Sequence, residues 1–139
     1  MFWGKIVHLI LGLVLYSSVT VFGQWSAANS GTTNNLNGVY LLGSGIAFVV
    51  GDGGTILKST NAGVTWAPLL SGITNTLYDV HFFDATQGVA VGNLGLILRT
   101  TDGGAMWQSV TSGVEDALRS VSFSGVNGIS GGDSQTILY

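Results

Sequence analysis

A tryptophan recurs every 41 residues in this chain, at Trp25, Trp66 and Trp107. Much of the intervening sequence recurs with it. Aligning residues 25–65 with residues 66–106 needs no gap and gives 14 identities in 41 positions. A fixed period of this size indicates one supersecondary unit that is used several times. The copies are residues 25–65, residues 66–106 and the shorter residues 107–139. The repetition reports what the unit needs in order to fold, and it carries little information about function.

Short apolar runs within each copy lie between clusters of glycine, asparagine and serine. The runs predict strands at residues 38–42, 46–50, 55–58, 66–70, 79–83, 89–91, 96–99 and 107–110. Four short strands at a spacing of about ten residues are typical of antiparallel structure. Four-stranded units of about 40–50 residues form the blades of β-propellers. We therefore expect an all-β fold of propeller blades, each with four antiparallel strands, and no helix in residues 24–139.

The turn between the third and fourth strands carries the sharpest motif, which reads STNAGVTW in the first copy and TTDGGAMW in the second. An Asp or Asn side chain accepts hydrogen bonds from the backbone amides that follow it. The glycine supplies a positive φ, and the tryptophan buries a large surface under the hairpin. The residues that we assign to this structural turn are Ser59, Asn61, Gly63, Thr65, Trp66, Thr100, Asp102, Gly104 and Trp107.

This turn resembles the Asp box, or BNR repeat, Ser/Thr-x-Asp-x-Gly-x-Thr-Trp. Asn61 replaces the acid but keeps the acceptor oxygen, and Met106 replaces the threonine. The preceding stretches, GDGGTILKS and GNLGLILRT, narrow the resemblance to the photosystem II stability/assembly factor family and its bacterial relatives. The resemblance covers residues 25–139. It implies a seven-bladed, non-catalytic propeller that works by holding other proteins, and it does not identify the partner.

Asp-box propellers also include sialidases and xyloglucan hydrolases, so part of a glycoside hydrolase, with a glycan ligand, is the alternative function. Such an enzyme needs two carboxylates that flank one bond, and a sialidase also needs an arginine cluster. The carboxylates are Asp52, Asp79, Asp84, Asp102, Glu115, Asp116 and Asp133. Asp52 and Asp133 hold equivalent turn positions, and Arg99 and Arg119 lie in different columns of the repeat. We therefore expect no catalytic residue.

Composition argues against several other classes of site. The chain has no Cys, which excludes disulfides and thiolate zinc sites. His81 has no second histidine in residues 24–139 with which to hold a metal. A net charge of −3, with Lys and Arg together numbering only 4, argues against nucleic acid as a partner. We expect no metal, no cofactor and no nucleic acid, and a protein partner of unknown identity.

Residues 1–23 predict a cleavable signal peptide. Lys5 precedes an apolar run over residues 6–16, and Gly23 provides a small residue at the cleavage position. The run is shorter than the roughly 20 residues that a membrane-spanning helix needs. Cleavage would leave residues 24–139 as a secreted or periplasmic chain that does not contact the membrane.

Positions that differ between the copies are the candidates for binding. Lys58 and Arg99 share one column and could begin a basic contact surface, or they could be solvated charges at strand ends. The first strands, which line the central channel of a propeller, vary in three columns. These columns are Asn37/Tyr78/Arg119, Gly38/Asp79/Ser120 and Tyr40/His81/Ser122.

The copies account for about 2.75 blades, whereas closed propellers have roughly four to eight. This count predicts an incomplete ring and an N-terminal part of a longer protein. It also predicts a lone fourth strand at residues 25–28 and an open edge at Leu138 and Tyr139, beside an apolar site. Since exposed strand edges pair with other chains, we expect the chain to self-associate. We further expect Trp66 and Trp107 to be buried and equivalent.

Overall fold

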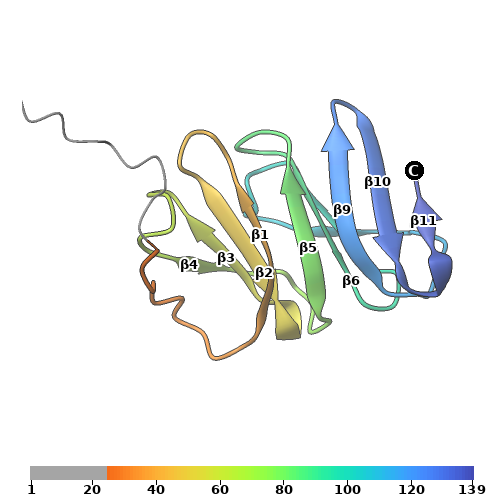
Figure 1. Cartoon of the computed structure of the whole chain (residues 1–139), viewed down its shortest axis with the longest axis horizontal. Coiled ribbons are helices and arrows are strands. Elements are labelled where there is room, and N and C mark those ends of the chain that lie inside the picture. The colour runs from red at the N-terminus through yellow and green to blue at the C-terminus, as the bar shows by residue number, and fades with distance from the viewer. Residues whose placement is uncertain (1–24) are drawn as a thin grey trace, which may run out of the picture.

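The computed structural model describes residues 25–139, so the predicted signal peptide at residues 1–23 lies outside the described residues. The described chain forms three antiparallel sheets that stand side by side in a row (Figure 1). We call them blades 1, 2 and 3 in chain order. Among residues 25–139, no helix is long and apolar enough to cross a membrane.

Each blade is a meander in which neighbours in sequence are neighbours in the sheet. Blade 1 contains β1 (Leu36–Leu41), β2 (Ala47–Gly51), β3 (Ile56–Ser59) and β4 (Ala67–Leu69). Blade 2 contains β5 (Leu77–Phe82), β6 (Gly88–Gly92), β7 (Ile97–Thr100) and β8 (Gln108–Val110). Blade 3 contains β9 (Leu118–Ser124), β10 (Asn127–Gly132) and β11 (Ile137–Leu138). The short 3₁₀ turns η1 (Asp52–Gly54) and η2 (Asp133–Gln135) precede β3 and β11. The all-β prediction is confirmed, and each predicted strand lies within about two residues of its observed bounds.

The blades repeat in register as well as in sequence. Val39 pairs with Val49 in blade 1, and Val80 pairs with Ala90 in blade 2. Val121 pairs with Ser130 in blade 3, which shows that the turn between β9 and β10 is one residue shorter than its counterparts. Equivalent residues of blades 2 and 3 are therefore 41 residues apart up to this turn and 40 residues apart after it.

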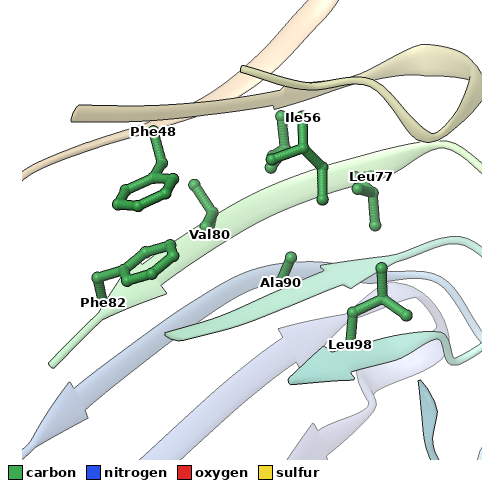
Figure 2. Close-up of a cluster of buried hydrophobic side chains, with 8 residues drawn as sticks. Phe48, Ile56, Leu77, Val80, Phe82, Ala90 and Leu98 are labelled. Carbon is green, nitrogen blue, oxygen red and sulfur yellow. The ribbon is translucent and has the colours of Figure 1, made fainter. Parts of the chain in front are cut away.

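The main core lies between blades 1 and 2 (Figure 2). Alternate residues of a strand point to opposite faces, so Val80 and Phe82 of β5 both face blade 1. The Phe82 ring stacks on Phe48 with the ring centroids 3.6 Å apart, and both side chains are fully buried. Full burial of such a side chain stabilises the fold by roughly 1.5–3 kcal/mol. A smaller cluster of Val91, Leu118 and Val121 joins blades 2 and 3.

The connectors between blades cross the preceding blade at a glycine. The amide of Gly54 donates to Asn75 O at 2.8 Å, and the amide of Gly95 donates to Asp116 O at 2.9 Å. A Cβ atom at Gly95 would overlap the carbonyl oxygen of Val114, and its φ is +65°. Both facts require glycine at this column wherever a connector crosses.

Two expectations about the tryptophans are wrong. Residues 25–28 are coil and Trp25 is fully exposed, so the lone fourth strand does not form. In blade 1 the fourth strand, β4, pairs with the third strand, β3. Among the described residues no strand precedes residues 25–28, so they have no such partner. Trp66 and Trp107 are both only partly buried, and they are not equivalent. Trp107 packs on the core between blades 1 and 2, whereas Trp66 lies beside Leu57, on the face of blade 1 that points away from blade 2.

Candidate functional site

The two Asp-box turns have the same geometry. Asn61 Oδ1 accepts the Thr65 amide at 2.9 Å, and Asp102 Oδ1 accepts the Met106 amide at 2.9 Å. Both acceptors also receive a hydroxyl from the residue two positions earlier, which is Ser59 in blade 1 and Thr100 in blade 2.

Each of these hydroxyl oxygens also accepts two backbone amides. One comes from Asn61 or Asp102 itself, at 3.3 Å. The other comes from Gly63 at 2.9 Å or from Gly104 at 3.0 Å. Both glycines have φ of +88°. The carboxylate of Asp102 thus does the work that the amide oxygen of Asn61 does in blade 1, which is to hold a turn.

Lys58 and Arg99 share a column but differ in environment. Lys58 Nζ donates to Gly103 O in the box turn of blade 2 at 3.0 Å, and it lies 5.3 Å from the centre of the Phe48 ring. It therefore ties blade 1 to blade 2. Arg99 is exposed and lies at an apolar groove between blades 2 and 3.

A row of polar side chains lies where the inner strands meet the 3₁₀ turns. We call it the polar rim, and its members are Asn37, Asp52, Tyr78, Arg119 and Asp133. Arg119 donates from Nε and Nη2 to the two carboxylate oxygens of Asp133, at 3.0 and 2.8 Å. Its guanidinium also stacks on the Tyr78 ring, 4.2 Å from the centroid. Both charged side chains are about half exposed, at 51% and 49%.

In blade 1 the same two columns are linked without an ion pair, because the donors to the aspartate are asparagine side chains. Asn37 Nδ2 donates to Asp52 Oδ1 at 3.1 Å and to Leu77 O at 2.9 Å, while Asn35 donates to the other carboxylate oxygen. An amide, a phenol, a guanidinium and two carboxylates thus lie on one edge of the three blades, with donors and acceptors exposed to solvent. Such a surface is suited to hydrogen bonding with peptide groups.

The carboxyl groups with shifted pKa values are all held ionised. Hydrogen bonds from Asn37 and then Asn35 lower the pKa of Asp52, and the Arg119 guanidinium lowers the pKa of Asp133. The hydroxyl and amide of Thr86 lower the pKa of Asp84 to about 2. The Met106 amide, followed by the Thr100 hydroxyl, lowers the pKa of Asp102. A glycosidase acid needs a carboxyl whose pKa is raised, and these four shift in the opposite direction.

His81 lies among aromatic rings. Its ring centroid is 4.6 Å from Tyr40, 5.6 Å from Phe83 and 5.4 Å from Phe123. Burial lowers its pKa, and the nearby Asp79 carboxylate opposes that shift. Asp79 itself accepts the Val121 amide of blade 3 at 2.9 Å, so it joins two blades. Among residues 25–139, no group of three His, Cys, Asp or Glu side chains is arranged to hold a metal ion.

The polar rim was only partly found from the sequence. The variable column of Asn37, Tyr78 and Arg119 was singled out, but its pairing with the column of Asp52 and Asp133 was not. The sequence did contain a signal for this pairing. The same two columns hold Asn37 and Asp52 in the first copy, and Arg119 and Asp133 in the third. Each pair is one hydrogen-bonding contact between the same two columns.

A family model matches residues 59–139, and its description is photosynthesis system II assembly factor YCF48. Two solved structures are similar to the chain. "YCF48 bound to D1 peptide" has a TM-score of 0.70 and 21% identity, over 84% of this chain and 40% of that one. "YCF48 from Cyanidioschyzon merolae" has a TM-score of 0.65 and 19% identity, over 76% of this chain and 36% of that one. The chain therefore spans well under half of either solved relative. No curated protein matches the chain.

Proposed function

The chain belongs to the family of the photosystem II assembly factor YCF48, whose model matches more than half of it, and we propose that it is a non-catalytic protein-binding module that acts as an assembly scaffold. The family match is the observation that carries the proposal. The fold agrees with it, because the solved relatives have the same propeller blades. One of these relatives is described as bound to a peptide, which supports a polypeptide segment as the ligand class.

We place the contact with the partner at the polar rim. Arg119 uses two of its five N–H groups on Asp133 and its side chain is about half exposed, so the guanidinium has N–H groups left for a partner. The ion pair and the Tyr78 ring fix the guanidinium, so little side-chain freedom is lost when a ligand binds. A preorganised, half-exposed arginine is a good donor to peptide carbonyl or carboxylate oxygens.

The test is a calorimetric titration of the full chain with the D1 peptide named for the solved relative, and with a scrambled version of it. We expect saturable binding of the native sequence, weakened about tenfold, or about 1.4 kcal/mol, by Arg119→Ala. Arg99→Ala is the matched control, because Arg99 is exposed but does not belong to the rim. Equal heats for the native and scrambled peptides, or equal effects of the two arginine substitutions, would contradict the proposal.

The proposal that the chain is not catalytic is supported by its carboxylates, which hold turns and form the polar rim. An assay with aryl-glycosides distinguishes this proposal from the glycoside hydrolase alternative, and we expect no turnover. Turnover that disappears on Asp52→Asn or Asp102→Asn would favour the hydrolase.

Export is the remaining part of the proposal, and it rests on the charged, apolar and small-residue order of residues 1–23. N-terminal sequencing of protein collected outside the cytoplasm should begin at Gln24. Retention of Lys5 in that protein would contradict cleavage.

A further inference from the structure

Blade 2 carries two asparagine side chains that are hydrogen-bonded to each other. Asn75 lies in the segment that leads into β5, and Asn93 lies in the turn between β6 and β7. Asn75 Nδ2 donates to Asn93 Oδ1 at 3.1 Å, and both residues are partly exposed. We call these two side chains the amide pair. Blade 2 stands between blades 1 and 3 (Figure 1), so the amide pair has a neighbouring blade on each side within residues 25–139.

Asn93 occupies the place that Asp52 and Asp133 occupy in the polar rim. The backbone amides of these three residues each donate to a carbonyl oxygen in the segment that leads into the first strand of the same blade, at 2.9 or 3.0 Å. The backbone of the turn is therefore the same in the three blades, and the side chain differs. Blade 2 presents a neutral carboxamide where blades 1 and 3 present carboxylates.

The side chain that would engage this position is turned elsewhere in blade 2. In blade 1, Asn37 donates to Asp52 at 3.1 Å. Tyr78 holds the place of Asn37 in blade 2, and its ring lies against the Arg119 guanidinium of blade 3. An asparagine side chain has two N–H donors and one acceptor oxygen. Asn93 contributes only its oxygen to the amide pair and is partly exposed, so its N–H groups are left for a partner.

Asn75 also differs in its contacts from the equivalent residue of blade 1. There Asn34 donates to the hydroxyl of Thr55 at 2.8 Å. Leu96 takes the place of that threonine in blade 2 and has no hydroxyl, and Asn75 donates to Asn93 instead. Asn75 contributes an N–H group to the amide pair, so its oxygen is left as an acceptor. The amide pair thus offers N–H donors and a carbonyl acceptor side by side.

This combination matches the backbone of an extended polypeptide. In the hydrogen-bonded pairs of an antiparallel ladder, the N–H and C=O of one residue both point to the same neighbour. We propose that the amide pair binds these two groups of one residue in an extended segment of the partner. The partner's C=O accepts from Asn93 Nδ2, and its N–H donates to Asn75 Oδ1. This inference rests on the proposed function, and it adds that blade 2 recognises the backbone of the bound segment.

The repeat itself supplies the substitution that tests this proposal. Asn93→Asp keeps the oxygen that accepts Asn75 Nδ2 and removes the N–H donors. It is compatible with the turn, because Asp52 and Asp133 hold the same position in the other blades. Asn127→Asp is the matched control, since Asn127 is exposed at the start of β10 and lies outside the amide pair.

Blocked pentaglycine, with acetylated and amidated ends, is a suitable probe because it is uncharged and offers only backbone groups. Added to the isotope-labelled full chain, it should shift the side-chain amide NMR signals of Asn75 and Asn93 saturably, and not the signal of Asn127. Asn93→Asp should weaken the binding at least about fivefold, as expected for a lost hydrogen bond, and Asn127→Asp should leave it unchanged. Blocked pentasarcosine, whose N-methyl groups replace every backbone N–H along the chain, should bind at least about fivefold more weakly.

The proposal is overturned if pentaglycine gives no saturable shift at the amide pair or an equal shift at Asn127. It is also overturned if the Asn93→Asp chain binds as tightly as the unmodified chain, or if pentasarcosine binds as tightly as pentaglycine. The titration with the D1 peptide separates this inference from the proposed function. Equal binding of that peptide by the unmodified and Asn93→Asp chains would overturn the inference alone. Lack of binding to the unmodified chain would contradict the proposed function, and the pentaglycine result would still decide the inference.

Discussion

Removing Trp107 should destabilise the chain far more than removing Trp66, although both lead an Asp-box strand. Trp107 packs on the buried core between blades 1 and 2, against Phe82. Replacing a buried tryptophan with alanine costs about 3–5 kcal/mol. Trp107 is only partly buried, and its Nε1 is buried without a hydrogen-bond partner among the described residues, so its removal also relieves a desolvation cost. The expected loss for Trp107→Ala is therefore about 2–3 kcal/mol.

Trp66 faces away from blade 2 and borders a groove with Leu57 and Pro68. Its removal forfeits contact on one side only, and we expect a loss of about 1 kcal/mol. Urea titration followed by circular dichroism measures both values. With a slope of about 1–3 kcal/mol per molar urea, the two midpoints should differ by about 1 M. Equal midpoints would mean that the neighbouring blade contributes nothing to the Trp107 site.

Three further outcomes follow from the same contacts. Gly95→Ala should cost at least about 1–3 kcal/mol, because its φ is +65° and the new Cβ would overlap Val114 O, whereas Gly131→Ala should be nearly neutral since no atom lies within 4 Å; similar urea midpoints for the two would be unexpected. Asp102→Asn should keep the urea midpoint and Asp102→Ala should lower it, because the turn needs only the acceptor oxygen; a loss with Asn as large as with Ala would show that the charge itself is needed. The lowered pKa of Asp84, about 2, means that its contribution to stability is present above the unfolded pKa of about 4 and is lost as pH falls through 2; carbon-detected NMR titration should show this midpoint, and a midpoint near 4 would contradict the turn.

The sequence predicted the blade itself because the blade is built from local signals. Glycine-fenced apolar runs located eight strands, and the Asn61 and Asp102 turns follow from side-chain acceptors that act within four residues. These features depend on residues that are close together in the chain. They also repeat at a fixed interval, so the aligned copies support the same assignment of strands and turns.

What the sequence did not predict depends on neighbouring blades. Trp66 and Trp107 both follow an Asp-box turn, yet within residues 25–139 only Trp107 has another blade to pack against. Lys58 was expected to be a surface charge or a contact residue, whereas it joins two blades through Gly103. The partnership of Arg119 with Asp133 spans a strand, a turn and a second strand, so it emerges only when the strands are paired in register.

Binding of polypeptides through the polar rim can be measured by selection from a displayed library of random peptides on the immobilised full chain. We expect enrichment of a related set of peptides that bind the unmodified chain and the Arg99→Ala chain equally, and that lose binding to the Arg119→Ala chain. Failure to enrich any peptide, or enrichment of the same set on the Arg119→Ala chain, would mean that the polar rim is not the peptide-binding surface.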